Sequence, residues 1–242
     1  SVEFWNDMRS YNALTFSPDG LRAWQISKNR DELFEYALSS AWDVSTMNID
    51  YTKQTVQLRG YIGELIKDMS FNNDGTKMYF AFGGNEPVSS QNKLIQVDLG
   101  TAYEPTTIDG SSIEYPTAPH THVEGFCFSA NGSYLYITED GVDDIFQFTL
   151  STPWDITTAS YTAIKETVGN NFGLHISSDG SNMYLMSTNG GSSTITSYMK
   201  QCTMTTPYDI TTLNYSSPTN TLTYRYQYSN ENASANTWNA SY

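Results

Sequence analysis

The sequence predicts an all-β fold built from four copies of one four-stranded antiparallel unit. A phrase with an Asp-Gly or Asn-Gly pair occurs four times, as "LTFSPDGLRAW", "MSFNNDGTKMYF", "FCFSANGSYLYI" and "LHISSDGSNMYL". A second phrase, "FTLSTPWDITTASYT", recurs as "YALSSAWDVSTMNIDYT" and "CTMTTPYDITTLNYS", and apolar residues alternate around both phrases. One such sheet has two apolar faces and needs a neighbour on each side. The sequence therefore predicts a β-propeller of four-stranded antiparallel blades.

The glycines of the first phrase set the repeat period. Gly20, Gly75, Gly132 and Gly180 are separated by 55, 57 and 48 residues, and periods of this size are typical of repeat architectures. We expect one propeller domain over residues 1–228, with repeats near 12–60, 66–116, 123–168 and 172–228.

The first two strands of each repeat, A and B, are predicted to form a hairpin. Strand A carries apolar residues two apart, such as Leu14 and Phe16, which is the period of a packed strand. The glycine after Asp or Asn supplies the positive φ angle of a tight turn. Strand B then brings an aromatic residue to one aligned position in every repeat: Trp24, Tyr79, Tyr136 and Tyr184.

Strand C alternates in the same way through Phe34, Tyr36 and Leu38, and the second phrase follows it directly. We expect the aromatic residue of that phrase to fill the core at the corner before strand D. The Asp and Thr or Ser after it would cap the turn by bonding backbone amides. The four aligned aromatic residues are Trp42, Tyr103, Trp154 and Tyr208.

The two ends of the chain resemble the outer strand of a repeat. "SVEFW" at the N-terminal end aligns with "YTAIK" of the third repeat. "WNASY" at the C-terminal end is similar to "TTASY", which precedes "TAIK" in that repeat. We expect a closed ring whose degenerate last blade uses residues 1–11 as a closing strand. The alternative is a segment of a longer array. Residues 229–242 are predicted to be a tail or docking arm.

Composition restricts the partners. The formal charge is −14 with a pI of about 4.4, so nucleic acid and anionic membranes would be repelled. No apolar run approaches the ~20 residues that span a bilayer, and two cysteines cannot form a disulfide scaffold. The abundance of Tyr, Thr, Ser, Asn and Gly favours an extracellular or surface-exposed protein.

The pattern "FSPDG…MY", followed by a strand and "Y.LSTPWDI", resembles the WD40-like and YVTN-like propeller repeats over residues 12–215. The variant is one associated with bacterial surface proteins and with virion or tail-fibre proteins of phages. The resemblance implies the propeller fold and a place on a virion or cell surface. The chain lacks the Gly-His element of WD40 repeats, so the scaffold roles of that family are not implied.

The loops at one end of the blades differ among the repeats, whereas the corners at the other end repeat closely. Irregular loops on a rigid scaffold are where binding usually occurs, so we expect the binding face there. The candidate binding residues are Asn12, Asp68, His120, His122, Glu124 and His175.

Two clusters could hold a metal ion. His120, His122 and Glu124 alternate in "HTHVEG", so in an extended chain they point the same way and suit zinc; a polar entry loop is the alternative. The loop "EDGVDD" suits calcium, or is a solvated acidic loop, and its carboxylates are Glu139, Asp140, Asp143 and Asp144.

The sequence contains no Gly-x-Ser-x-Gly elbow, phosphate loop, HExxH or Cys-x-x-Cys. We therefore predict a non-catalytic structural or adhesive module that binds glycan or surface protein, with other virion proteins or a second copy as further partners. Aromatic and amide side chains suit sugars. The alternative is an extracellular metal-dependent hydrolase or lactonase-like enzyme with its site at the channel mouth, using Asn12, Asp68, Glu124 and His175.

Overall fold

The computed structural model describes most of the chain. The described residues are 11–27, 32–49, 56–57, 66–82, 93–116, 123–139, 144–167, 170–191 and 194–227. Residues 1–10 of the predicted closing strand and the predicted tail 229–242 lie outside them. Within the described residues, no helix is both long enough and apolar enough to pass through a membrane.

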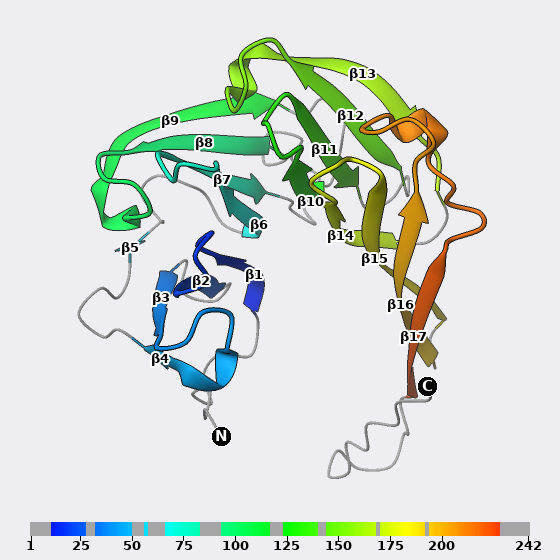
Figure 1. Ribbon diagram of the computed structural model, residues 1–242, viewed down its shortest axis with the longest axis horizontal. Helices are drawn as coiled ribbons and strands as arrows, with labels where there is room; N and C mark the ends of the chain where they lie inside the picture. Colours follow the sequence, from blue (N-terminus) through cyan, green and yellow to red (C-terminus); the bar gives the residue numbers. More distant parts are fainter. Residues whose placement is uncertain are drawn as a thin grey trace. The chain divides into compact units, whose positions relative to one another are not determined.

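Each repeat forms one antiparallel sheet (Figure 1). The first contains β1 (Tyr11–Phe16), β2 (Arg22–Ser27), β3 (Glu32–Leu38) and β4 (Met47–Ile49), with β5 (Val56–Gln57) also paired to β3. The second contains β6 (Ile66–Phe71), β7 (Lys77–Phe82), β8 (Lys93–Leu99) and β9 (Ile108–Pro116). The third contains β10 (Val123–Phe128), β11 (Tyr134–Glu139), β12 (Ile145–Leu150) and β13 (Ala159–Lys165). The fourth contains β14 (Asn170–Ile176), β15 (Asn182–Gly191), β16 (Thr194–Thr203) and β17 (Asn220–Gln227).

The corner after the third strand of each sheet contains one turn of 3-10 helix. These turns are η1 (Val44–Thr46), η3 (Pro105–Thr107), η4 (Ile156–Thr158) and η5 (Ile210–Thr212). The sheets confirm the predicted fold class, an all-β propeller of four-stranded antiparallel blades.

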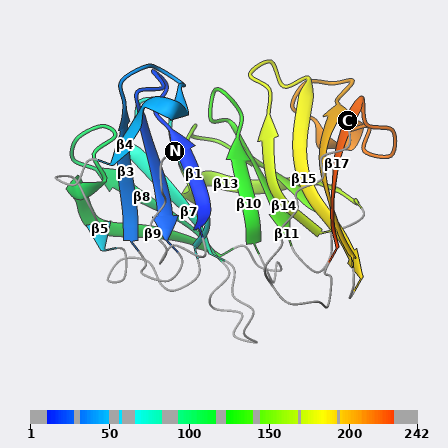
Figure 2. The ribbon, with the colours of Figure 1, turned by 90° about the horizontal axis from the view of Figure 1, so that it is seen from below.

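The chain divides into two compact units. Unit 1 comprises residues 1–123 and 154–158, and unit 2 comprises residues 124–153 and 159–242. In unit 1 the apolar residues of the first sheet, among them Trp24 and Leu33, pack against those of the second. In unit 2 the third and fourth sheets pack in the same way, with Tyr136 and Met183 in one cluster. Figure 2 shows the strands of the two pairs of sheets from another side.

The turn between the first two strands owes its shape to one acidic or amide side chain and one glycine. The glycines have φ angles of 69° to 72°, which a residue with a Cβ adopts only with strain. In the fourth repeat, Asp179 Oδ1 accepts from the Ser181 amide at 3.0 Å. Asn131 makes the same bond to Ser133 at 3.1 Å, so Asp and Asn are interchangeable here, and the predicted hairpins are confirmed.

The aromatic residue of the corner lies over this glycine. Its own φ is positive in all four repeats, 58° to 66°, and in the first repeat the Trp42 amide donates to the Gly20 carbonyl at 2.9 Å. A Cβ at Gly20 would come within 2.5 Å of the Trp42 indole. The predicted Asp cap is confirmed as well, because Asp43 Oδ1 accepts from the Ser45 amide at 3.0 Å.

The prediction that this aromatic ring fills the core is wrong for the two tryptophans, whereas Tyr103 and Tyr208 are partly buried and pack against the core clusters of their units. Trp42 is 59% exposed and Trp154 is half-buried. The side chain that enters the core comes two residues later, where Ile156 and Ile210 are 0% exposed. In the first, second and fourth repeats the ring lies over the glycine of the turn.

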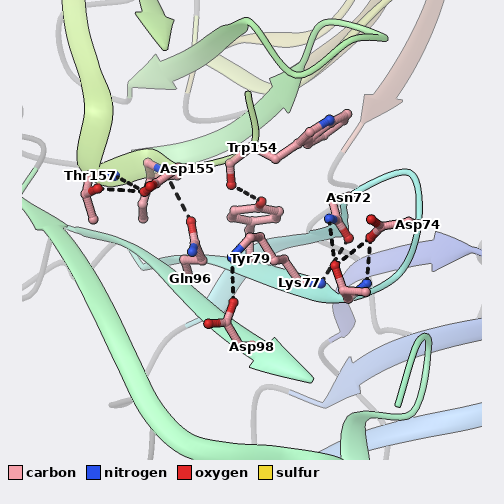
Figure 3. A network of polar contacts seen from close by, with 11 residues as sticks. Asn72, Asp74, Lys77, Tyr79, Gln96, Asp98, Trp154, Asp155 and Thr157 are labelled. Carbon is pink, nitrogen blue, oxygen red and sulfur yellow. Dashed lines mark hydrogen bonds and ion pairs between the residues drawn. The ribbon is translucent and has the colours of Figure 1, made fainter. Parts of the chain in front are cut away.

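The corner of one repeat docks on the sheet of the repeat before it (Figure 3). In unit 1 the Tyr79 hydroxyl donates to the Trp154 carbonyl at 2.5 Å, and the Ile156 amide donates to Gln96 Oε1 at 3.1 Å. Tyr79 is fully buried, and this burial raises its pKa, so the hydroxyl stays protonated as a donor.

Unit 2 repeats this docking with different residues. The Tyr136 hydroxyl donates to the Tyr208 carbonyl at 2.8 Å, and the Ile210 amide donates to Gln147 Oε1 at 3.1 Å. An aromatic residue on the second strand and a glutamine on the third strand together hold the next corner. We call this combination the tyrosine–glutamine pair.

The first sheet holds the next corner by ionic contacts instead. The corner residue equivalent to Ile156 is Pro105, which has no amide hydrogen to donate, and Glu35 replaces the glutamine. Arg22 Nη2 lies 2.6 Å from Glu35 Oε1 and 3.1 Å from Glu104 Oε1. Trp24 replaces the tyrosine, and its ring stacks on Tyr103 at 6.2 Å.

We expect the turn carboxylates to make the fold acid-sensitive. Hydrogen bonds from Ser177 and from Ser181 lower the pKa of Asp179 to about 2, below its ordinary value of 3.8. A carboxyl with a lowered folded-state pKa stabilises the fold above its unfolded-state pKa, and this contribution is lost as the pH falls through the folded-state value. The melting temperature should therefore fall between pH 4 and pH 2.

The Asp179→Asn variant tests this expectation, because Asn131 shows that an amide accepts the same turn bond. Its melting temperature should equal that of the wild type at neutral pH and fall less on acidification, as measured by circular dichroism. An identical acid profile in both proteins would show that this carboxyl contributes nothing to the pH dependence.

Candidate ligand-binding cleft

A small cleft of about 170 Å³ lies in unit 1, where the first turns of the first two repeats meet. Its wall combines aromatic rings with hydroxyl and amide groups. The lining residues are Thr15, Phe16, Ser17, Pro18, Trp42, Ser70, Phe71, Asn72, Asn73 and Tyr103. No residue in this wall carries a charge, so the cleft suits a neutral ligand.

The aromatic side of the cleft comes from both repeats. The Phe16 and Trp42 rings lie 5.6 Å apart in the first repeat. The Phe71 and Tyr103 rings lie 5.4 Å apart, in the second. Trp42 is the most exposed of the four, at 59%, and its indole is held over Gly20. The cleft therefore has a fixed and exposed aromatic surface at its edge.

The polar side consists largely of groups that already hold the turns. Asn72 Oδ1 accepts from the Lys77 amide at 2.9 Å, and Asn72 Nδ2 donates to Thr76 Oγ1 at 3.2 Å. The Asn73 carbonyl accepts from the Tyr103 hydroxyl at 2.5 Å, while the Asn73 side chain is exposed at the edge of the cleft. These bonds make the wall rigid before any ligand arrives, which lowers the entropy cost of binding.

The cleft lies at the regular end of the blades, not among the irregular loops where we expected binding. Residues 83–92, 140–143 and 117–122 of those loops lie outside the described residues, so the predicted binding face remains a prediction. His120, His122, Asp140 and Asp143 are among these residues.

The other predicted site residues lie within the described part of the chain, where hydrogen bonds or burial place several of them in the fold. Asp68 is half-buried in unit 1, where its Oδ1 accepts from the Met69 amide at 2.8 Å. Glu124 and Glu139 are buried in unit 2, at 7% and 1% exposed. The Asp144 carbonyl accepts from the Glu139 amide at 3.4 Å.

We expected His175 to line the channel or to pack inside its blade; it does not pack inside the blade, and its place at a channel remains a prediction. It is exposed on β14, with its ring 6.3 Å from that of Tyr184. Asn12 lies in β1 at a register shift between Tyr11 and Ala13. Among the described residues, no three His, Cys, Asp or Glu side chains gather as a metal site would require.

The fold is similar to those of known propellers. The chain matches a Lactobacillus plantarum protein with a TM-score of 0.53 at 15% identity, covering 86% of this chain and 54% of that one. It matches a Bacteroides fragilis protein, provisionally a 6-phosphogluconolactonase, with a TM-score of 0.50 at 15% identity and coverage of 86% and 53%. Kuenenia stuttgartiensis hydrazine synthase gives a TM-score of 0.50 at 15% identity, with coverage of 82% and 47%.

The chain thus spans about half the length of the solved structures it matches. No protein-family model matches the chain, and no curated protein matches it in sequence. At these identities the likeness shows the fold alone: a β-propeller similar to the YVTN-like and lactonase-like propellers.

Proposed function

We propose that this chain is a non-catalytic, adhesive β-propeller module that binds a neutral carbohydrate in the cleft between its first two repeats. The observation that carries the proposal is the cleft wall, which joins four aromatic rings to uncharged hydroxyl and amide groups. Aromatic faces stack on the apolar faces of sugar rings, and amides and hydroxyls bond sugar hydroxyls.

The size and charge of the cleft support this ligand class. A volume of about 170 Å³ is below the range of ~300–1,000 Å³ typical of drug-sized ligands, and it suits a single sugar unit at the end or edge of a glycan. The chain carries a net charge of −14, so a neutral glycan would meet less repulsion than an acidic one. An extracellular setting, on a bacterial or virion surface, fits a module of this kind.

Trp42→Ala should weaken carbohydrate binding, because it removes the most exposed ring of the cleft. Binding would first be found with an array of neutral glycans and then quantified by titration calorimetry. We expect affinity to fall by about tenfold or more, since stacking on one aromatic ring is worth ~1–2 kcal/mol.

Trp154→Ala is the matched control, because Trp154 occupies the same corner position in the third repeat but does not line the cleft. It should weaken the fold about as much as Trp42→Ala and leave carbohydrate affinity unchanged. Equal loss of binding in both variants, or normal binding by Trp42→Ala, would refute the cleft as the site. Trp42→Phe should retain part of the affinity.

A further inference from the structure

One face of the fourth sheet is apolar and exposed. The antiparallel register places Tyr184 opposite Gln201, and Met186 opposite Met199, which in turn lies opposite Leu222. Directly opposed residues point to the same side of a sheet. Tyr184 is 37%, Met186 54%, Met199 45% and Leu222 40% exposed. We call these four residues, with Gln201 and the neighbouring His175, the fourth-sheet face.

The equivalent face is buried in the second and third sheets. The equivalent residues in the second sheet are Tyr79, Ala81, Leu94 and Gln96, which are 0% to 2% exposed. In the third sheet they are Tyr136, Thr138, Ile145 and Gln147, which are 0% to 5% exposed. Exposed apolar surface of this kind marks an interaction site.

The fourth-sheet face retains the residues that hold a corner. Tyr184 and Gln201 stand opposite each other, as Tyr79 and Gln96 do on the second sheet. No described corner is hydrogen-bonded to them: Gln201 Nε2 donates to Asn182 Oδ1 at 3.2 Å and Gln201 Oε1 accepts from Asn220 Nδ2 at 3.0 Å, both within the fourth sheet. In the described part of unit 2, the tyrosine–glutamine pair of the fourth sheet is therefore present without the corner that it binds elsewhere.

Within the described residues of unit 1, no sheet holds the corner of the first repeat. Val44 is 59% exposed, whereas its equivalents Ile156 and Ile210 are 0% exposed. This corner has the geometry of the docked ones, with a positive φ of 63° at Trp42 and the Asp43 cap on η1. Its Trp42 carbonyl and Val44 amide occupy the positions that the tyrosine–glutamine pair binds in the later repeats.

We infer that the fourth-sheet face binds the first-repeat corner of a second copy of this chain. The contact has the geometry of the interface between successive repeats. The Tyr184 hydroxyl donates to the Trp42 carbonyl, and Gln201 Oε1 accepts from the Val44 amide. The Val44 side chain then packs on the apolar face. Docked corners keep their aromatic ring half-buried, as at Trp154 and Tyr208, so the Trp42 ring stays available to the cleft.

The interface is head-to-tail, because it joins two different surfaces of the same chain. The apolar cluster of the first sheet behind the corner, which includes Tyr36 and Phe34, is already buried. Only the first-repeat corner contacts the second copy, so the contact area is small and association should depend on concentration.

Sedimentation velocity over a range of concentrations tests this association. The wild-type chain of 27.1 kDa should form species of at least twice that mass. Val44→Asp and Tyr184→Arg should each raise the dissociation constant by about tenfold or more, because each puts a charge into an apolar contact. Tyr161→Asp removes a ring that is more exposed than that of Tyr184, at 55% against 37%, from β13, and should leave association unchanged.

Mixing the two charged variants identifies the pairing. Each variant keeps one intact surface, the corner in Tyr184→Arg and the fourth-sheet face in Val44→Asp. At a concentration where each variant alone is monomeric, an equimolar mixture should therefore form a discrete one-to-one dimer. A monomeric wild type would overturn the inference. So would association that survives Val44→Asp but not Tyr184→Arg, since that result means the face pairs with itself or with another segment.

Discussion

Replacing Ile210 by alanine should lower the free energy of unfolding by about 2–5 kcal/mol. The side chain is 0% exposed and lies in the apolar cluster that joins the third and fourth sheets of unit 2. Alanine leaves a cavity there, while the backbone bond from residue 210 to Gln147 Oε1 is retained. Urea denaturation followed by intrinsic fluorescence measures the loss.

Val44→Ala is the control at the same corner position. Val44 is 59% exposed, so its truncation should change the stability of the monomer by no more than about 0.5 kcal/mol. If the two variants lost equal stability, the buried residue of the corner would not be the one two positions after the aromatic residue, and the docking that we describe would be wrong.

The repeats and the turns could be predicted from the sequence, because their signals are local. Alternating apolar residues define a strand, and a glycine after Asp or Asn defines a tight turn. The predicted repeat 66–116 corresponds closely to β6 through β9, which span Ile66 to Pro116.

The burial of the corner residues could not be predicted in the same way. An alignment of repeats places Trp42 with Trp154, and Val44 with Ile156, but burial depends on the sheet that stands before each corner. Ile156 meets the tyrosine–glutamine pair of the second sheet, whereas Val44 has no preceding repeat among the described residues. Aligned residues thus have the same backbone conformation but are buried to different extents.

The tyrosine–glutamine pair left a signal that the sequence reading missed. Gln96, Gln147 and Gln201 occupy the same position on the third strand of three repeats. Because a polar residue at a buried position needs a hydrogen-bond partner, this recurring glutamine indicates a recurring partner. The cleft left no such signal, because its wall combines the turns of two repeats, with Ser17 and Asn72 separated by a whole repeat.

Gly180→Ala should destabilise the chain by about 2–4 kcal/mol, for two reasons. Gly180 has a φ of 71°, a conformation that costs a residue with a Cβ ~1–2 kcal/mol. The new Cβ would also lie 2.5 Å from the Tyr208 ring, so the ring must move. The Tyr208 hydroxyl bonds the Ser178 carbonyl, and the Tyr208 carbonyl accepts the bond from Tyr136. A displaced ring therefore disturbs the docking of the corner as well as the turn.

A double-mutant cycle separates the two contributions. Tyr208→Ala removes the ring, so Gly180→Ala made in that background should cost only the φ term, and the two changes together should cost less than the sum of the single losses. Gly173→Ala is the control in the same unit, because a Cβ there would meet no atom within 4 Å, and its stability should stay near that of the wild type. Strictly additive losses would mean that the ring does not rest on Gly180. The two repeated phrases would then need another explanation, because every repeat has a glycine with positive φ in the first phrase and an aromatic residue with positive φ in the second.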